Sequence, residues 1–339
     1  MSSSDARVLQ TRCRRAEEER GGGLTSPPHP VDNARRHCHV RARPARAAAA
    51  RGVACAMHVR TVRRLHPARR DDIADLTTRR PLPGPGLDQL DPFLFLNHHG
   101  PQTYPPGNRG LPFGPHPHRG FETVTFILAG DLAHRDSGGH DSIISAGGVQ
   151  WMTAGRGIVH AEISPAAFMQ DGGALEILQL WVNLPARLKM VAPRYTGLQR
   201  DAIPAITADQ ARVTLQAISG MWEGTAGPIA SLTDVAMATL HLAPGGQMCL
   251  PVAAGRAVLL YVVRGAISVG GSVAAAFDLV ELNDDGDAVA LAAATEAVLL
   301  FGHAPPLGEP VVAHGPFVMN TRAEILQAIR DYEAGAFGA

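Results

Sequence analysis

The sequence predicts an all-β protein with two β-barrel domains and a C-terminal helix, preceded by a disordered N-terminal tail. From residue 58 onward, short apolar runs alternate with glycine-rich turns at intervals of about ten residues, which is typical of barrels and sandwiches. This pattern breaks around residues 187–207 and then resumes, so the body divides into two halves of similar size. We therefore expect domains at residues 57–186 and 187–339, after a tail at residues 1–56.

The tail is rich in Arg, Gly and Ala, and it has neither a strand period nor a sustained apolar helix face. Such a composition is typical of disorder. Glu17, Glu18 and Glu19 argue against a transit peptide, and the apolar region of a secretory signal is missing. Two other interpretations stay open: a basic arm that binds nucleic acid, and a true start of the protein at Met57.

Composition and charge narrow the classes of partner. The 339 residues include 31 Lys and Arg against 31 Asp and Glu, so the formal net charge is zero. No apolar run approaches the roughly 20 residues that cross a bilayer. We therefore expect a soluble, cytoplasmic monomer with no direct nucleic-acid or membrane partner.

The four cysteines show neither a CxxC pair nor the spacing of a disulfide framework. They are Cys13, Cys38, Cys55 and Cys249. This spacing predicts a reducing compartment and argues against a cysteine-based metal site.

In the first half, residues 90–100 (LDPFLFLNHHG) predict a short apolar strand that ends in a turn. Further strands are expected at residues 123–128, 142–144, 149–152 and 175–184. Adjacent residues of a strand point to opposite faces, so His98 and His99 cannot chelate one ion together. We favour a turn-capping pair, with one of them at a cavity mouth as the alternative.

In the second half, strands are expected from residue 213 to about residue 301. His241 and His303 are isolated there, which predicts a second barrel without metal. Near the end, Thr321 and Glu324 form a capping-box pattern, and the residues after them make one apolar helical stripe. We expect a helix over about residues 322–334 that packs on a barrel.

Two short phrases carry the chemistry: His116-Pro117-His118 and His160-Ala161-Glu162. Alternate residues of a strand share a face, so each phrase presents two metal-capable side chains side by side. Two such strands facing each other inside a barrel would bring three imidazoles and one carboxylate to one point. That set suits a first-row transition metal such as iron, with coordination positions left open for chemistry. His134 and His140 flank a glycine-rich turn and are expected at the surface.

Glu122 is an even number of positions from His116 and His118, so on one continuous strand it would share their face. A straight strand would place it about 13 Å beyond His118, so it could coordinate only if the chain bends, for which Gly120 is the natural place. We therefore favour Glu162 as the ligand, and Glu122 as a residue behind the ligands or a partner of Arg119.

Longer phrases indicate a family. Gly110 with His116 and His118, and Gly157 with His160, resemble the two metal motifs of the cupins. The phrases HPHRGFETVTF, GGVQWMTAGRGIVHAE, LQLWVNLP, HGPFVMNT and LDPFLFL resemble the pirin family over residues 58–337. The resemblance implies two cupin-type, jelly-roll-like barrels with a metal, usually iron, in the N-terminal barrel only. It also implies His116, His118, His160 and Glu162 as ligands.

The resemblance implies a first functional hypothesis: a quercetin 2,3-dioxygenase that cleaves a flavonol or related enol with O2, using one divalent metal per chain, Fe(II). The catalytic base would be Glu162 or Glu122. The second hypothesis is an iron-dependent, redox-sensing co-regulator that binds a protein partner, either a transcription factor or a metabolic enzyme. The third is a stress-linked metal-binding protein whose substrate is not a flavonoid.

Overall fold

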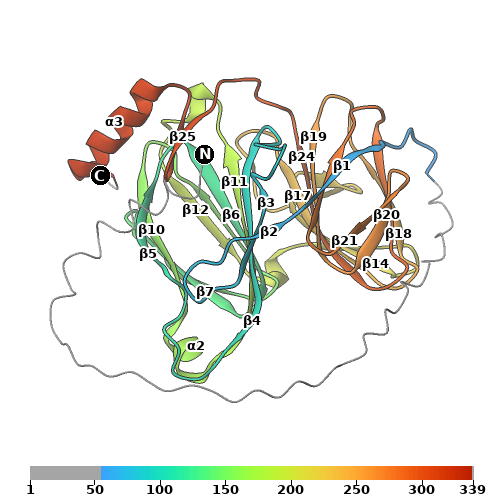
Figure 1. The fold of residues 1–339 in the computed structure, drawn as a ribbon, viewed down its shortest axis with the longest axis horizontal. Coiled ribbons are helices and arrows are strands. Elements are labelled where there is room, and N and C mark those ends of the chain that lie inside the picture. The colour runs from blue at the N-terminus through green and yellow to red at the C-terminus, as the bar shows by residue number, and fades with distance from the viewer. Residues whose placement is uncertain (1–54, 338–339) are drawn as a thin grey trace, which may run out of the picture. The chain divides into compact units, whose positions relative to one another are not determined.

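The computed structural model describes residues 55–337, which belong to one compact unit (Figure 1). The described part is built mainly of antiparallel strands and has one longer helix near its end, which confirms the all-β class. The predicted tail lies outside the described residues, apart from its last two. No helix within residues 55–337 is long and apolar enough to cross a bilayer.

The first barrel consists of a seven-stranded sheet, in the order β12-β9-β6-β11-β4-β3-β2, and a four-stranded sheet, β5-β10-β7-β8. Short helices α2 (Ala166–Asp171) and η1 (Ala186–Leu188) lie in its connections. The strands are β2 (Arg69–Arg70), β3 (Thr78–Leu82), β4 (Phe93–Tyr104), β5 (Phe113–His118), β6 (Phe121–Ala129), β7 (Asp131–Asp136), β8 (Asp141–Ser145), β9 (Val149–Thr153), β10 (Ile158–Ile163), β11 (Gly173–Asn183) and β12 (Arg194–Leu198).

The second barrel repeats this plan, with sheets β1-β22-β19-β24-β17-β14-β13 and β18-β23-β20-β21. Helix η2 (Arg200–Ala202) precedes β13, and two short hairpins, β15–β16 and β25–β26, complete the described strands. The strands are β1 (Val62–Pro67), β13 (Ala205–Ala208), β14 (Val213–Ser219), β15 (Met221–Trp222), β16 (Thr225–Ala226), β17 (Ala236–Leu242), β18 (Gln247–Pro251), β19 (Ala257–Arg264), β20 (Ala266–Val269), β21 (Ser272–Ala275), β22 (Asp278–Leu282), β23 (Ala288–Ala292), β24 (Ala297–Ala304), β25 (Val312–His314) and β26 (Phe317–Met319).

The interiors of the two barrels differ in chemistry. Aliphatic side chains from β14, β17, β19 and β24 fill the second barrel. His241 lies at its surface beside Glu296, and the Nδ1 of His303 accepts a hydrogen bond from Arg256. The first barrel instead buries Thr125, Glu162 and several histidines. A polar site is therefore expected inside the first barrel.

Strand β11 explains how the first barrel can be polar inside and still be held firmly. Leu178, Leu180 and Val182 point to one face and join an apolar cluster that includes Leu259 and Tyr261 of β19. Gln179 and Trp181 point to the other face, into the first barrel, where they contact Glu162 and His118. Apolar packing between the barrels thus supports the sheet that carries the polar face.

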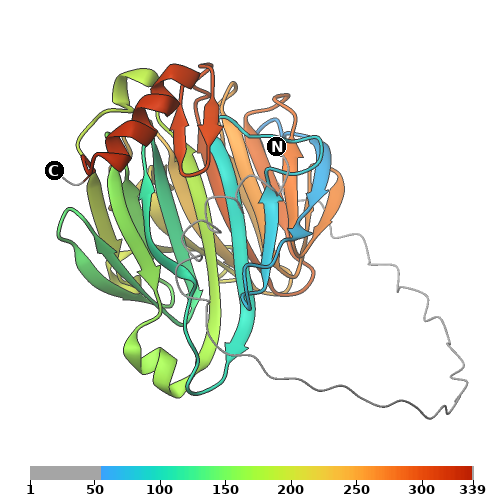
Figure 2. The same cartoon turned by 60° about the vertical axis from the view of Figure 1, so that its left-hand side comes forward.

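The terminal segments are exchanged between the barrels. β1 lies within the predicted first domain, but it pairs with β22 of the second barrel (Figure 1). β12 follows the predicted boundary at residue 186, yet it pairs with β9 of the first barrel. Helix α3 (Arg322–Glu333) lies against the first barrel, as Figure 2 shows. The boundaries predicted from chain order therefore do not give barrel membership, because strand pairing joins segments far apart in sequence.

Helix α3 has the capping box that the sequence predicted: the Thr321 side chain accepts from the Glu324 backbone N–H, and the Glu324 side chain accepts in return. Ile325 and Ala328 are buried in a small cluster with Phe317 and Phe337. The prediction of one terminal helix packed on a barrel is confirmed.

The cysteine spacing gave no sign of a disulfide, but Cys55 and Cys249 form one, with their Cα atoms 5.8 Å apart. Val59 bridges to Ala288 of β23, and β23 also pairs with β18, which carries Cys249. The start of the described chain is thereby placed beside β18. Sequence spacing could not show this, since the two residues are 194 positions apart. The expected reducing compartment loses the observation on which it rested.

Candidate metal centre

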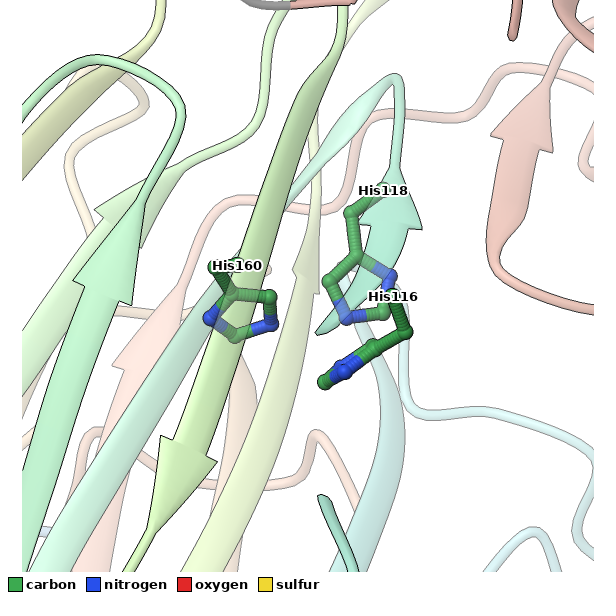
Figure 3. Close-up of side chains that lie close together, drawn as sticks. All are labelled: His116, His118 and His160. Carbon is green, nitrogen blue, oxygen red and sulfur yellow. The ribbon is translucent and has the colours of Figure 1, made fainter. Parts of the chain in front are cut away.

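Strands β5 and β10 bring the two metal-binding phrases together. They pair antiparallel, with His160 opposite His116 and Ile158 opposite His118. Directly paired residues share a face, and so do residues two apart, so the three histidines point to the same side. Their nearest ligand atoms all lie within 4.8 Å of one another, and Figure 3 shows the rings turned toward one another. The structure therefore brings together three of the four predicted metal-binding side chains.

The hydrogen bonds of His116 and His118 define which nitrogen faces the site. The Nδ1 of His116 donates to the Gly114 carbonyl at 2.8 Å, and the Nδ1 of His118 donates to the Pro316 carbonyl at 3.3 Å. A carbonyl oxygen can only accept, so each Nδ1 carries the proton. Each Nε2 is left with a free lone pair, which is the form that ligates a metal.

His160 tests whether a metal fits. Its side chain is buried, and neither ring nitrogen has a hydrogen-bond partner among the described residues. Leaving a buried polar group unpaired costs about 1–3 kcal/mol. A metal ion bound between the three rings would use a nitrogen of His160 that is otherwise unsatisfied. The donor set and the unpaired nitrogens therefore fit a metal.

The protonation states also suit metal binding. Burial lowers the pKa of His118 and of His160 well below the ordinary histidine value, and the neighbouring imidazoles lower each pKa further. Burial lowers the pKa of His116 as well. All three rings are therefore neutral near pH 7, so a metal does not have to displace a proton from them.

Glu162 lies on the same face of β10 as His160, two residues further along. Its side chain is buried, with Oε1 accepting from Thr125 at 2.7 Å and Oε2 accepting from Gln179. Burial raises the pKa of Glu162 to about 7. The cluster of ligand atoms within 4.8 Å of one another contains the three histidines and not this carboxylate. The structure thus places Glu162 beside the triad, held by two other side chains.

Glu122 lies on the face opposite the candidate metal centre, so it does not point inward as its predicted catalytic role required. Gly120 has φ +88°, and the turn there reverses the parity between β5 and β6. Phe121 consequently points inward, with its ring 5.0 Å from that of His118, while Glu122 points to the opposite face. There its Oε1 accepts from Thr153 at 2.6 Å. Its predicted partner Arg119 instead forms an ion pair with Asp331 at 2.6 Å.

We expect Gly120→Ala to lower the free energy of unfolding by more than about 2 kcal/mol. The positive φ disfavours any side chain, and an added Cβ would also overlap the Val318 carbonyl oxygen. Gly139→Ala is the matched control, because Gly139 has φ +91° but no atom within 4 Å of an added Cβ, so it should cost only about 1 kcal/mol. Urea unfolding of both variants checks this, and equal losses would contradict the close approach.

His134 was expected at the surface, but it is buried next to the triad. Its ring stacks on Tyr195 at 3.9 Å and lies 5.4 Å from the ring of His160. Its Nε2 lies 2.9 Å from Asp136, which also contacts the exposed His140. The alternation of His134 and Asp136 along one strand is the same i, i+2 signal as in the two metal phrases. It was the available clue to an inward-facing pair.

His98 and His99 do point to opposite faces, as predicted, but the turn-capping interpretation was wrong because β4 continues through both residues. His98 contacts Tyr261 and Glu176, each at 3.0 Å, between the barrels. His99 points into the first barrel, where its Nδ1 lies 2.8 Å from the Thr78 hydroxyl. Neither belongs to the triad.

Aromatic side chains form one wall of the centre. Trp181 lies 5.4 Å from the ring of His118 and 4.4 Å from Phe121, and it stacks on Phe95 at 4.7 Å. Phe121 is fully buried and Trp181 half-buried, and the Trp181 Nε1–H has no hydrogen-bond partner among the described residues. Aromatic side chains therefore pack directly against the ring of His118.

Comparison with known proteins decides the family. Residues 75–182 match the family model described as Pirin, and residues 237–338 match the model described as Pirin C-terminal cupin domain. The chain belongs to the pirin family. The triad lies within the residues that match the first pirin model.

Several relatives are similar to this pirin-family chain over most of their own length. A pirin-like protein of Caulobacter vibrioides is 42% identical over 268 residues, covering 78% of this chain and 94% of the relative. A protein of Pseudomonas aeruginosa named "Putative quercetin 2,3-dioxygenase" is 39% identical over 248 residues, covering 73% and 87%. A crystal structure of a quercetin 2,3-dioxygenase from Acinetobacter baumannii superposes with a TM-score of 0.77 at 33% identity, covering 83% of this chain and 99% of that one.

Proposed function

We propose that this pirin-family chain is a metal-dependent dioxygenase of the quercetin 2,3-dioxygenase type, which cleaves a flavonol or a related enol with O2. The observation that carries the proposal is the triad of neutral imidazoles, two of them buried, in which His160 has no hydrogen-bond partner among the described residues. The names of the Pseudomonas and Acinetobacter proteins support the reaction type.

The Nε2 atoms of His116 and His118 and a nitrogen of His160 would hold the metal. We propose Glu162 as the fourth ligand, because it shares the face of His160 on β10. Nitrogen and carboxylate ligands with open positions suit iron(II). When bound, the metal supplies a Lewis acid that lowers the pKa of a substrate hydroxyl and couples the substrate electronically to O2.

The surrounding side chains would orient the substrate and move its proton. The half-buried Trp181, which lies beside His118, would contact the aromatic ring of the substrate and direct a hydroxyl toward the triad. Glu162 would accept the proton of that hydroxyl, while the hydrogen bonds from Thr125 and Gln179 hold its carboxylate in place. Of the two carboxylates predicted from the sequence, Glu162 is the one that faces the interior.

The test is elemental analysis of the purified protein, followed by anaerobic addition of quercetin and then oxygen. We expect roughly one iron per chain, because the triad is a single site, and loss of the quercetin absorbance only after oxygen is added. Removal of the metal with a chelator should abolish turnover, and Fe(II) should restore it. Iron without turnover would contradict the dioxygenase and favour the redox co-regulator. A chain that holds no metal would contradict both functions.

A further inference from the structure

The C-terminal strap, which we define as residues 312–337, docks on the turn that follows the metal-binding strand β5. Its strand β26 bridges in parallel to Arg119 through Phe317, and the Val318 backbone N–H donates to the Arg119 carbonyl at 3.0 Å. The strap follows the second barrel in the chain but lies against the first one (Figure 2). The residue next to ligand His118 is therefore held by a segment about 200 positions away.

Lys189 joins the strap to this turn from inside the protein. Its side chain is buried, and Nζ donates to the carbonyls of Gly120 at 2.8 Å and Val318 at 3.1 Å, and to the side chain of Asn183 at 2.7 Å. One ammonium group thus bonds one acceptor on the turn, one on the strap and one at the end of β11. A buried cation is costly unless it is well bonded, so these three acceptors must stay in place together.

Arg119 makes a second connection from the turn to the strap. Its Nη1 lies 2.6 Å from Asp331 of α3, and its guanidinium lies 4.5 Å from the centre of the Phe337 ring. Arg119 is itself buried, so this ion pair is shielded from solvent on one side.

The strap also touches a ligand directly. The hydrogen-bond acceptor for the Nδ1 of His118 is the carbonyl of Pro316, in the turn between β25 and β26, whereas His116 uses Gly114 of its own strand. The hydrogen bond on the non-ligating nitrogen fixes both the tautomer and the orientation of a ligand imidazole. His116 therefore carries its own support in β5, and His118 depends on the strap.

We infer that the C-terminal strap is part of the metal centre: its Pro316 carbonyl holds His118 with Nε2 toward the metal, and Lys189 is the positioning residue that fixes the strap to the β5–β6 turn. This inference rests on the proposed metal site, but it does not require the dioxygenase reaction.

The first measurement is the affinity of the full-length apo protein for Co(II), by competition with a chelator. We expect Lys189→Met to weaken Co(II) binding by about 10–100-fold and to change the visible Co(II) spectrum, because the support of one ligand is loosened. Asp331→Asn alters the partly exposed end of the Arg119 ion pair, and it should also weaken Co(II) binding. This second variant keeps the test valid if Lys189→Met does not fold.

Arg60→Met is the matched control. Arg60 is also a buried cation, and it donates to the carbonyls of Ala253, Arg256 and Gly286 in the second barrel. We expect this variant to lower the melting temperature without changing the Co(II) affinity or spectrum. The comparison separates loss of a buried cation in general from loss of the support of His118.

The second measurement is the tautomer of His118, by NMR of 15N-histidine-labelled apo protein. We expect the Nδ1–H form in the wild-type chain and a shift toward Nε2–H in Lys189→Met or Asp331→Asn. A wild-type His118 in the Nε2–H form, or unchanged Co(II) affinity in both variants, would overturn this inference alone. A wild-type chain that binds no Co(II) would overturn the metal site and this inference with it.

Discussion

His160→Ala is expected to abolish metal retention while leaving the first barrel folded. The variant removes one of three nitrogen ligands, and it should weaken binding by more than about 100-fold, since even partners behind the ligands contribute 10–100-fold. Metal content after gel filtration measures the loss, and circular dichroism checks the fold. His241→Ala, at the surface of the second barrel, should leave the metal content unchanged. Full iron occupancy in His160→Ala would show that the site assignment is wrong.

The same position allows a test without metal. Both nitrogens of His160 are buried and have no hydrogen-bond partner within residues 55–337, so the apo protein carries the cost of keeping them from water. We expect His160→Leu, which fills a similar volume with apolar atoms, to raise the free energy of unfolding of the apo protein by about 1 kcal/mol. Urea unfolding in the presence of a chelator measures this. A clear loss of stability would mean that His160 has a structural partner.

The second large effect is expected at the contact between the barrels. Glu176 is buried and accepts from the buried His98 at 3.0 Å and from Arg264 at 2.9 Å. Glu176→Ala leaves the buried His98 without this hydrogen-bond partner, and an unpaired buried polar group costs about 1–3 kcal/mol. We expect urea unfolding to show that loss, with metal affinity unchanged because this network lies outside the first barrel's interior.

Glu296→Ala is the matched control for Glu176→Ala. Glu296 also pairs with a histidine, His241, at 2.9 Å, but the two side chains are 68% and 53% exposed. A solvent-exposed pair contributes little, so we expect a change within about 0.5 kcal/mol. Similar losses in the two variants would contradict the special role of the buried network.

The metal site was predictable where the signal is local. An i, i+2 pair on one strand depends only on the alternation of side chains, so the two phrases pointed to His116, His118 and His160, which the structure brings together. The same alternation gave the wrong face for Glu122. Gly120, which has a positive φ, lies between β5 and β6, and the turn there reverses which alternate residues point inward. The two-barrel class was predictable in the same way, from the repeated strand and turn pattern.

Features that depend on pairing between distant segments could not be predicted from the sequence. The β1–β22 pair, the Cys55–Cys249 disulfide and the Pro316 carbonyl at His118 each join residues about 200 positions apart. Lys189 gives no sequence signal either, because all its acceptors are oxygen atoms that only the folded chain brings together.

The exchanged terminal segments impose an order on how the protein matures during synthesis. Residues 57–186 leave the ribosome first, but the support of His118 is supplied by residues 312–337, which are made almost last. The segment that carries all three histidines of the triad is therefore made before the segment that holds His118 in place. By the inferred role of the strap, tight metal loading would have to wait until translation has passed the second barrel, and a chain that terminates early would lack a finished centre.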